Sequence, residues 1–280
     1  MTTVELAGVV EDLDEAEYHA HPALSSSQAR TLLASPARYR YEREQGPRPP
    51  TRDMELGTCV HTEVFATGQQ FDVLPGDDLR QKAVKDAKAE FEARGMIALK
   101  SSEYALVRGM ADAVRDHPEA GRLLDLDVGT AEVSAFWDDA QTGVPCRARF
   151  DWLLRNGRAI VDLKTTGDAS PGALGRHMDR FGYHIQAAWY RDAAKALGLS
   201  DGEPEFVWVF VEREPPHFVT VARLAPVDLQ LGHELAAQAR QMWRDCTEVD
   251  VWPGYPEHII TVTLPPWSRR SHEIEEHASW

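Results

Sequence analysis

Residues 151–164 read Asp-Trp-Leu-Leu-Arg-Asn-Gly-Arg-Ala-Ile-Val-Asp-Leu-Lys, a pattern typical of two strands joined by a tight Asn-Gly turn. Because side chains alternate between the two faces of a strand, Asp162 and Lys164 are expected on one face. Asp151 lies on the first strand, and the apolar run before Asp162 indicates that the second strand is buried. Charges in a buried strand are costly unless a metal ion or a substrate compensates them. We therefore expect these three residues to mark a binding site.

The composition is that of a soluble globular protein, with 43% hydrophobic and 27% charged residues among 280. No run of about 18 apolar residues occurs, so we expect no membrane span. The first residues lack a basic region followed by an apolar one, which argues against a secretory signal. The three cysteines, Cys59, Cys146 and Cys246, lie far apart, which argues against a disulfide framework or a four-cysteine metal site. We therefore expect a protein of the reducing cytoplasm.

The net charge of −15 argues against a nucleic-acid partner, because binding to phosphates is mainly electrostatic. Net charge averages over the whole surface, however, and a local basic patch can persist on an acidic protein. One basic cluster consists of the six arginines between Arg30 and Arg52. A second surrounds the 151–164 stretch and comprises Arg147, Arg149, Arg155, Arg158 and Lys164. A nucleic-acid partner therefore stays open.

The hydrophobic pattern predicts a helical first part, followed by strands mixed with helices. Two of the expected helices, 80–94 and 101–116, carry many charges, so we expect both on the surface. The other helices are expected at 28–34, 54–67, 171–179, 183–197 and 227–244. Strands are expected at 130–137, 144–154, 158–165, 206–212 and 218–224.

No linker rich in glycine or serine divides the chain, so we expect a single domain over residues 1–280. The order of elements predicts an α/β fold of the α+β type, with a mixed sheet and a helical N-terminal part. The expected parts are an irregular segment 1–23, a mainly helical part 24–128, a catalytic sheet core 129–225, a C-terminal helix and strand 226–268, and a disordered tail 269–280.

Two further patterns lie on expected helices. The first is Gly57-Thr-Cys-Val-His61, and the second is Gln186-Ala-Ala-Trp-Tyr190, in which the spacing of four puts Gln186 and Tyr190 on one helix face. Taken alone, a histidine such as His61 is more often packed or on the surface than a ligand. Each pattern is weak by itself, but their order along the chain, with the two acidic strands between them, is specific.

Together these patterns resemble the PD-(D/E)XK nuclease superfamily. The resemblance is strongest to the branch that contains the RecE-type exonuclease (exodeoxyribonuclease VIII, C-terminal nuclease domain) and helicase-associated nuclease domains. That branch has Gly-xxx-His, then Asp, then Asp/Glu-x-Lys, then Gln-xxx-Tyr, and all four occur here in order. The segment from His21 to Glu42 also looks like the start of a RecE nuclease domain, so the resemblance covers roughly residues 18–225. It implies a restriction-endonuclease-like core.

The resemblance implies a metal site on these residues. Asp151 and Asp162 supply carboxylates, which suit magnesium because it prefers oxygen ligands. The resemblance adds the backbone carbonyl of Leu163 and the imidazole of His61, and that nitrogen would suit Mn²⁺, which we expect to substitute for Mg²⁺. Glu132, on the preceding strand, is a further candidate for binding a second metal.

Three residues are expected to act beside the metal. Lys164 would orient or deprotonate the attacking water, or stabilise charge on the phosphate. Gln186 and Tyr190 would position the nucleic-acid backbone or the side chains of the site. The alternative for the last two residues is an ordinary helix surface position and an ordinary core position, but we favour the site role.

Four arginines are candidates for contact with DNA. Arg38 and Arg40 alternate with tyrosines, a pattern that suits phosphate contact and base stacking, although a solvated helix end fits it as well. Arg147 and Arg149 lie on the strand that leads to Asp151.

The resemblance implies a metal-dependent exonuclease that degrades double-stranded DNA from its ends, 5′ to 3′, and exposes a 3′ single strand for recombination. It also implies a phage or prophage setting, a single-strand annealing protein as partner and a closed homo-oligomeric ring. Two alternatives remain at this point. One is another nuclease of the superfamily, such as an endonuclease or a CRISPR-adaptation nuclease, and the other is a non-catalytic DNA-binding module on the same fold.

Overall fold

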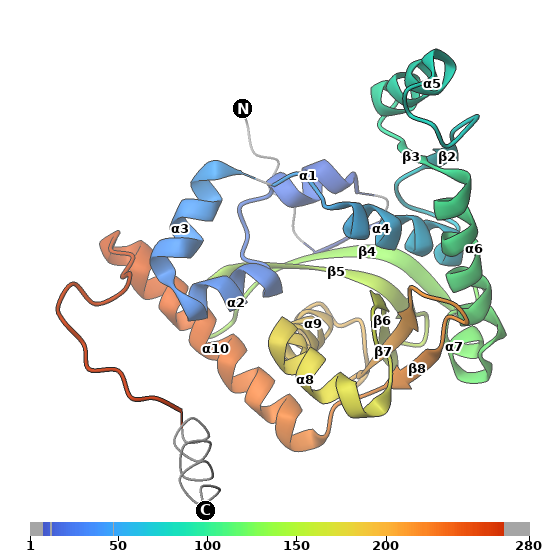
Figure 1. Ribbon diagram of the computed structural model, residues 1–280. Coiled ribbons are helices and arrows are strands. Elements are labelled where there is room, and N and C mark those ends of the chain that lie inside the picture. The colour runs from blue at the N-terminus through green and yellow to red at the C-terminus, as the bar shows by residue number, and fades with distance from the viewer. Residues whose placement is uncertain (1–7, 12, 47, 266–280) are drawn as a thin grey trace, which may run out of the picture.

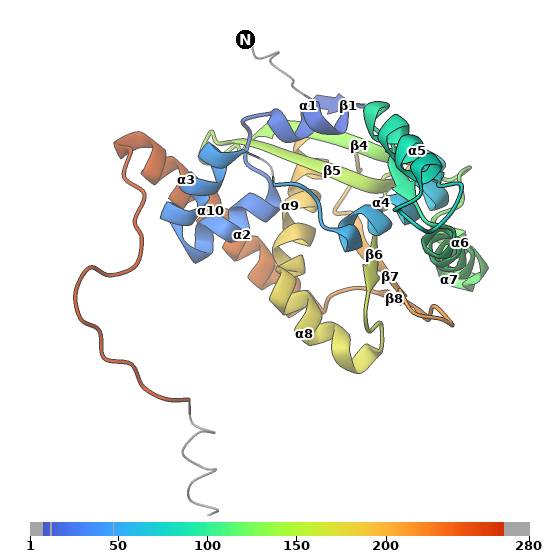
Figure 2. The same cartoon turned by 45° about the horizontal axis from the view of Figure 1, so that its top comes forward.

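The protein is a three-layer arrangement in which helices cover both faces of a six-stranded sheet (Figures 1 and 2). The computed structural model describes residues 8–11, 13–46 and 48–265. The strand order is β1-β4-β5-β6-β7-β8; β6 and β7 run parallel, and the other neighbours run antiparallel. The strands are β1 (Gly8–Val10), β4 (Gly129–Asp138), β5 (Pro145–Leu154), β6 (Ala159–Thr166), β7 (Glu205–Glu212) and β8 (Val219–Ala222). The expected mixed α/β fold is confirmed.

Two hydrophobic cores lie on opposite faces of the sheet, as the alternation of side chains along buried strands requires. On β6, Ile160 belongs to the first core, whereas Val161 and Leu163 belong to the second. Asp162 shares the face of Ile160 and therefore points towards α9. The first core is covered by α2 (Ser26–Ala34), α8 (Pro171–Phe181), α9 (Tyr183–Ala196) and α10 (Pro226–Val249), and the second by α4 (Arg52–Phe65), α6 (Ser101–Asp116) and α7 (Pro118–Leu123).

A small lobe projects from the end of α6 in Figure 1. It consists of the parallel strands β2 (Phe71–Val73) and β3 (Ile97–Leu99) with α5 (Lys82–Ala93), and Leu74, Val84 and Ala98 form its own small core. No helix in the described ranges is both long and apolar enough to cross a membrane. The three cysteines are buried and free.

Four expectations about the elements are wrong. The segment 1–23 is not wholly irregular, because β1 pairs with β4 and α1 (Glu15–Ala20) follows it. A further helix, α3 (Pro36–Gln45), begins directly after α2 because Ser35 caps it and a proline is tolerated in a first turn. Helix α6 buries one face in the second core. Between α10 and residue 265 the structure shows no strand. The expected tail 269–280 lies outside the described residues.

The turn between β5 and β6 is longer than the tight Asn-Gly hairpin expected from the sequence. Trp152 pairs with Val161 and Leu153 with Ile160, so the connection spans residues 155–158. Gly157 has φ of 65°, and a Cβ there would lie 2.2 Å from the backbone oxygen of Leu199. The glycine is therefore required both by its left-handed backbone and by a close approach of another loop.

We predict that Gly157→Ala destabilises the protein by about 2 kcal/mol or more, because it adds a backbone clash to the cost of a left-handed alanine. Gly143→Ala is the matched control, since Gly143 has φ of 70° with no atom within 4 Å of its Cβ position. We expect that control to cost only about 1 kcal/mol. Denaturant unfolding of the three proteins measures both values, and equal losses would contradict the role given to Leu199.

Candidate active site

The strands β5 and β6 stop pairing where the two aspartates lie. Their backbone pairing ends at Trp152 and Val161, one residue short of Asp151 and Asp162. Instead of a strand partner, the N–H of Leu163 donates to Asp151 Oδ2 at 3.1 Å. A side chain thus replaces a rung of the sheet, and the two strands separate around a partly buried charged group.

Asp162 is held from two sides. Its Oδ2 lies 2.5 Å from Lys164 Nζ, as expected for two residues on one strand face, and its Oδ1 accepts a 2.7 Å hydrogen bond from Gln186 Nε2 on α9. Asp162 is completely buried. The lysine does not approach Oδ2 in hydrogen-bonding geometry, so this oxygen has no hydrogen-bond partner in the structure. It keeps the capacity to bind a further positive group.

His61 reaches the same place from the other face of the sheet. Its Nε2 lies 2.8 Å from the carbonyl oxygen of Leu163, and its Nδ1 lies 3.8 Å from Asp151 Oδ2. Because a carbonyl can only accept, Nε2 carries the proton of this hydrogen bond. Helix α4 can lie this close to β6 because Gly57 has no side chain, and a Cβ there would come within 3.3 Å of Thr165 Oγ1. The Gly57–His61 pattern therefore packs the helix and places the imidazole.

Glu132 lies on β4 directly opposite Asp151. Ala131 pairs with Trp152 and Val133 with Phe150, but the two acidic residues between them are not paired. Glu132 has φ of 51°, a left-handed conformation that is rare for a residue other than glycine, asparagine or aspartate. Backbone strain of this kind concentrates at functional sites. Arg149 Nε stands 4.0 Å from its carboxylate.

The carboxylates repel one another more than the nearby cations compensate. Burial, followed by the charge of Asp151, raises the pKa of Asp162 to about 6. Burial and the same charge raise the pKa of Glu132 to about 7. For Lys164, burial lowers the pKa, but the charges of Asp162 and Asp151 outweigh it, and the pKa lies above its ordinary value. Lys164 is therefore a permanent ammonium group near neutral pH.

Tyr190 is buried in the first core. It lies one turn beyond Gln186, and its ring packs in the first core against Phe150 and Phe206. Tyr183, one turn before Gln186, is closer to the site, because Lys164 Nζ lies 5.6 Å from the centre of its ring. The sequence reasoning missed Tyr183, although the spacing of three from Gln186 places both on one helix face.

The four arginines expected to contact DNA have different surroundings. Arg147 is only 3% exposed, and its guanidinium donates to the backbone carbonyls of Tyr18 and His21, which argues against a contact with DNA. Arg149 donates to Ser134 Oγ and to the carbonyl of Leu13, so it joins the N-terminal segment to β4. Arg38 and Arg40 are exposed on α3, and Arg40 pairs with Glu44 and Asp250.

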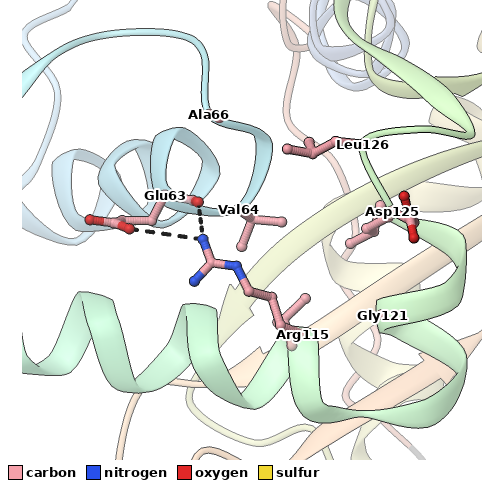
Figure 3. A pocket seen from close by; sticks show the side chains of 9 residues that line it. Glu63, Val64, Ala66, Arg115, Gly121, Asp125 and Leu126 are labelled. Atoms are coloured by element: carbon pink, nitrogen blue, oxygen red, sulfur yellow. Dashed lines mark hydrogen bonds and ion pairs between the residues drawn. The ribbon is translucent and has the colours of Figure 1, made fainter.

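A separate pocket of about 270 Å³ lies between the end of α4 and the helices α6 and α7 (Figure 3). Arg115 crosses it to donate to the carbonyl of Glu63. None of the residues expected in the site lines this pocket. Its lining residues are Glu63, Val64, Ala66, Val114, Arg115, Gly121, Leu124, Asp125 and Leu126. The charged group at β5 and β6 is therefore the stronger candidate.

The donor groups at the charged site are of the types that bind divalent cations. They comprise the carboxylates of Asp151 and Asp162, the Leu163 carbonyl and the His61 ring, and oxygen-rich sets of this kind suit Mg²⁺ or Mn²⁺. Asp162 Oδ2 is buried and makes no hydrogen bond of normal geometry, and the pKa values of two carboxyl groups are raised by burial and by the charge of Asp151. A bound cation would relieve both conditions. Within the described ranges, no three His, Cys, Asp or Glu side chains are close enough to hold a metal. Binding would therefore replace contacts that the donors now make with one another.

A family model described as "PDDEXK-like domain of unknown function (DUF3799)" matches residues 25–264. The chain belongs to this family. The resemblance to the PD-(D/E)XK superfamily is thereby confirmed, and the match includes every expected site residue. No curated protein matches the chain.

Solved structures resemble the fold. A proposed exonuclease from Eubacterium rectale is 11% identical, with a TM-score of 0.58, and the similarity covers 91% of this chain and 95% of that one. A phage-related exonuclease from Haemophilus somnus 129PT is also 11% identical and covers 82% of this chain and 97% of its own, but its TM-score is only 0.36. At these identities the first structure supports the fold alone.

We predict that Glu132→Gln stabilises the metal-free protein above pH 7. Since the pKa of this carboxyl is about 7 in the folded state and 4.5 as its ordinary value, the wild-type protein loses stability as the pH rises between these values. A glutamine carries no charge at any pH, so the gain, on the order of 1–3 kcal/mol at pH 8, vanishes below pH 4.5. Denaturant unfolding with chelator at pH 4.5, 6 and 8 measures this, and a gain independent of pH would contradict it.

Proposed function

We propose that the protein is a divalent-metal-dependent exodeoxyribonuclease that hydrolyses phosphodiester bonds at the ends of double-stranded DNA. One observation carries the proposal: Asp151, Asp162, Lys164, Gln186 and His61 converge where two core strands separate. A purely structural role would not favour several buried charges at one point, because unmatched charges destabilise a core. The family supports the same chemistry, since its fold is PDDEXK-like.

In this proposal Asp151, Asp162 and the Leu163 carbonyl hold the cation, with His61 beside them and Glu132 as a candidate for a second ion. When bound, the cation supplies positive charge to the phosphate and to the leaving oxygen. Lys164 supplies a second positive charge. In the metal-free protein the charges of Asp162 and Asp151 raise its pKa, which favours a role as a donor that stabilises charge on the phosphate.

Gln186 has a positioning role in the proposal. Its amide donates to Asp162 Oδ1 and so leaves Oδ2 directed towards Lys164. Hydrogen bonds to a metal ligand orient it and tune its affinity for the ion. Tyr190 supports this helix from the core and is not given a role in the chemistry.

The resemblance to RecE-type enzymes supports three finer parts of the proposal. These are 5′ to 3′ polarity, a closed homo-oligomeric ring around DNA, and a single-strand annealing protein as partner in recombination. Digestion of linear DNA labelled at either its 5′ or its 3′ end measures the polarity. The mass of the protein in solution, with and without DNA, measures the assembly, and a persistent monomer on DNA would remove the ring.

We predict that linear duplex DNA is degraded with Mg²⁺ or Mn²⁺ and remains intact with chelator. Asp162→Asn and Lys164→Met should each reduce the rate by about 10²-fold or more, the usual loss when a group that stabilises transition-state charge is removed. Lys85→Met is the matched control, because Lys85 is exposed on α5 in the projecting lobe. Full activity in Asp162→Asn would contradict the proposal. Efficient cutting of closed circular DNA would instead indicate an endonuclease.

We further predict that Gln186→Ala reduces activity by about 10- to 100-fold and raises the metal concentration needed for half-maximal rate. Gln186→Glu should not restore it, because a second carboxylate would repel Asp162. A titration of the rate against Mn²⁺ measures both effects. A loss of rate with an unchanged metal requirement would contradict the positioning role.

A further inference from the structure

A fixed, exposed aromatic ring lies beside the candidate site. Phe181 is the last residue of α8, and it is 40% exposed although its ring contacts other aromatic side chains. Its ring centre lies 5.8 Å from that of Tyr183, with the two planes 25° apart, and 4.7 Å from that of His177. One face of the Phe181 side chain is thus packed while another part meets solvent.

This ring continues a stack that begins at the lysine. Lys164 Nζ lies 5.6 Å from the centre of the Tyr183 ring, and Phe181 stacks on that same ring. Tyr183 in turn stacks on Trp208 and Phe210 of β7, so the inner end of the row is anchored in the first core. Only the Tyr183 side chain therefore separates the exposed Phe181 ring from Lys164, whose positive charge we propose acts on the phosphate.

Arg30 fixes the backbone at Phe181 through two contacts. Arg30, on α2, donates from Nη1 to the carbonyl of Phe181 at 2.7 Å. The next residue, Gly182, has φ of 66°, and a Cβ there would lie 2.8 Å from Arg30 Cδ. The turn between α8 and α9 is thus fixed by Arg30 of α2. Because the Phe181 ring is already ordered, binding a ligand to it costs little conformational entropy.

Two arginines lie next to Phe181. The guanidinium carbon of Arg180 lies 5.6 Å from the centre of the Phe181 ring, and Arg180 and Arg30 are both exposed. Aromatic rings flanked by cations suit nucleic acid, because the ring stacks on a base while the cations meet the phosphates. Phe218 is even more exposed, at 63%, but no described aromatic ring or cation lies against it. Exposure alone therefore does not distinguish Phe181, whereas its stack and its arginines do.

We propose that Phe181, together with Arg180 and Arg30, forms a stacking platform for an unpaired base of the DNA strand that enters the site. The proposal rests on the proposed function for the direction of the strand, and it identifies single-stranded DNA next to the cut as the part of the substrate that is bound. The base stacks on Phe181 while its neighbouring phosphate lies towards Lys164. Splaying a base away from the duplex would thus be part of how an end is engaged.

The test measures binding without cutting. A short fluorescent oligothymidylate is titrated with the full-length protein in chelator, and the same titration is repeated with an oligonucleotide of equal length whose sugars carry no bases. We expect Phe181→Ala to weaken binding of oligothymidylate by about tenfold, the order of one lost base–aromatic stack. The oligonucleotide without bases should bind the wild-type and variant proteins equally. Phe181→Tyr, which keeps a ring, should restore binding, and Phe218→Ala should bind like the wild type.

Two results would overturn the platform. One is unchanged binding of oligothymidylate by Phe181→Ala, and the other is an equal loss for both oligonucleotides, which would mean that the ring supports the fold or the phosphate contacts. Circular dichroism and unfolding of each variant exclude misfolding as the cause. Cutting by Asp162→Asn tests the proposed function separately. If Asp162→Asn stays active, the proposed nuclease mechanism is wrong, but the binding measurements still test the stacking platform. If Phe181→Ala binds oligothymidylate normally, the stacking platform is wrong, but the proposed mechanism is unaffected.

Discussion

The site depends on a hydrogen bond from the backbone N–H of Leu163 to the carboxylate of Asp151. It replaces the sheet contact that would otherwise hold β5 and β6 together beyond Trp152 and Val161. Because the rung is a side chain, the strands can separate while the backbone donor stays satisfied. The separation leaves the Leu163 carbonyl free to meet His61, while the alternation of side chains along β6 turns Asp162 towards Gln186.

The second constraint is electrostatic and concerns the three carboxylates of the site. Glu132, Asp151 and Asp162 gather at one place, where Lys164 lies against Asp162 and Arg149 lies near Glu132. Burial and the charge of Asp151 still raise the pKa values of Glu132 and Asp162. A protein stabilised only by its cores would gain nothing from this arrangement. In the proposed function this excess of negative charge would favour a bound cation, and the charge of that cation would in turn attract phosphates.

Much of the fold followed from local patterns. The apolar strand at 158–165 and the helix at 183–197 could be predicted from the hydrophobic pattern, and a spacing of two was enough to place Asp162 and Lys164 on one strand face. Short segments were harder to predict from the sequence. For example, β1 forms a strand because it pairs with β4, and its own residue pattern does not indicate one. Helix α6 was expected on the surface, because its many charges hid an apolar face that only packing reveals.

Residue types and their spacing were enough to indicate the family and the group formed by Asp151, Asp162 and Lys164, since neighbouring positions on a strand or helix have set geometry. Which partner each side chain meets was a matter of long-range packing. Arg147, next to the site in sequence, turns inward to two backbone carbonyls, and Tyr190 enters the core. Arg30 reaches across to the carbonyl of Phe181. Contacts between residues more than a hundred positions apart depend on how whole elements pack, and no local spacing encodes that.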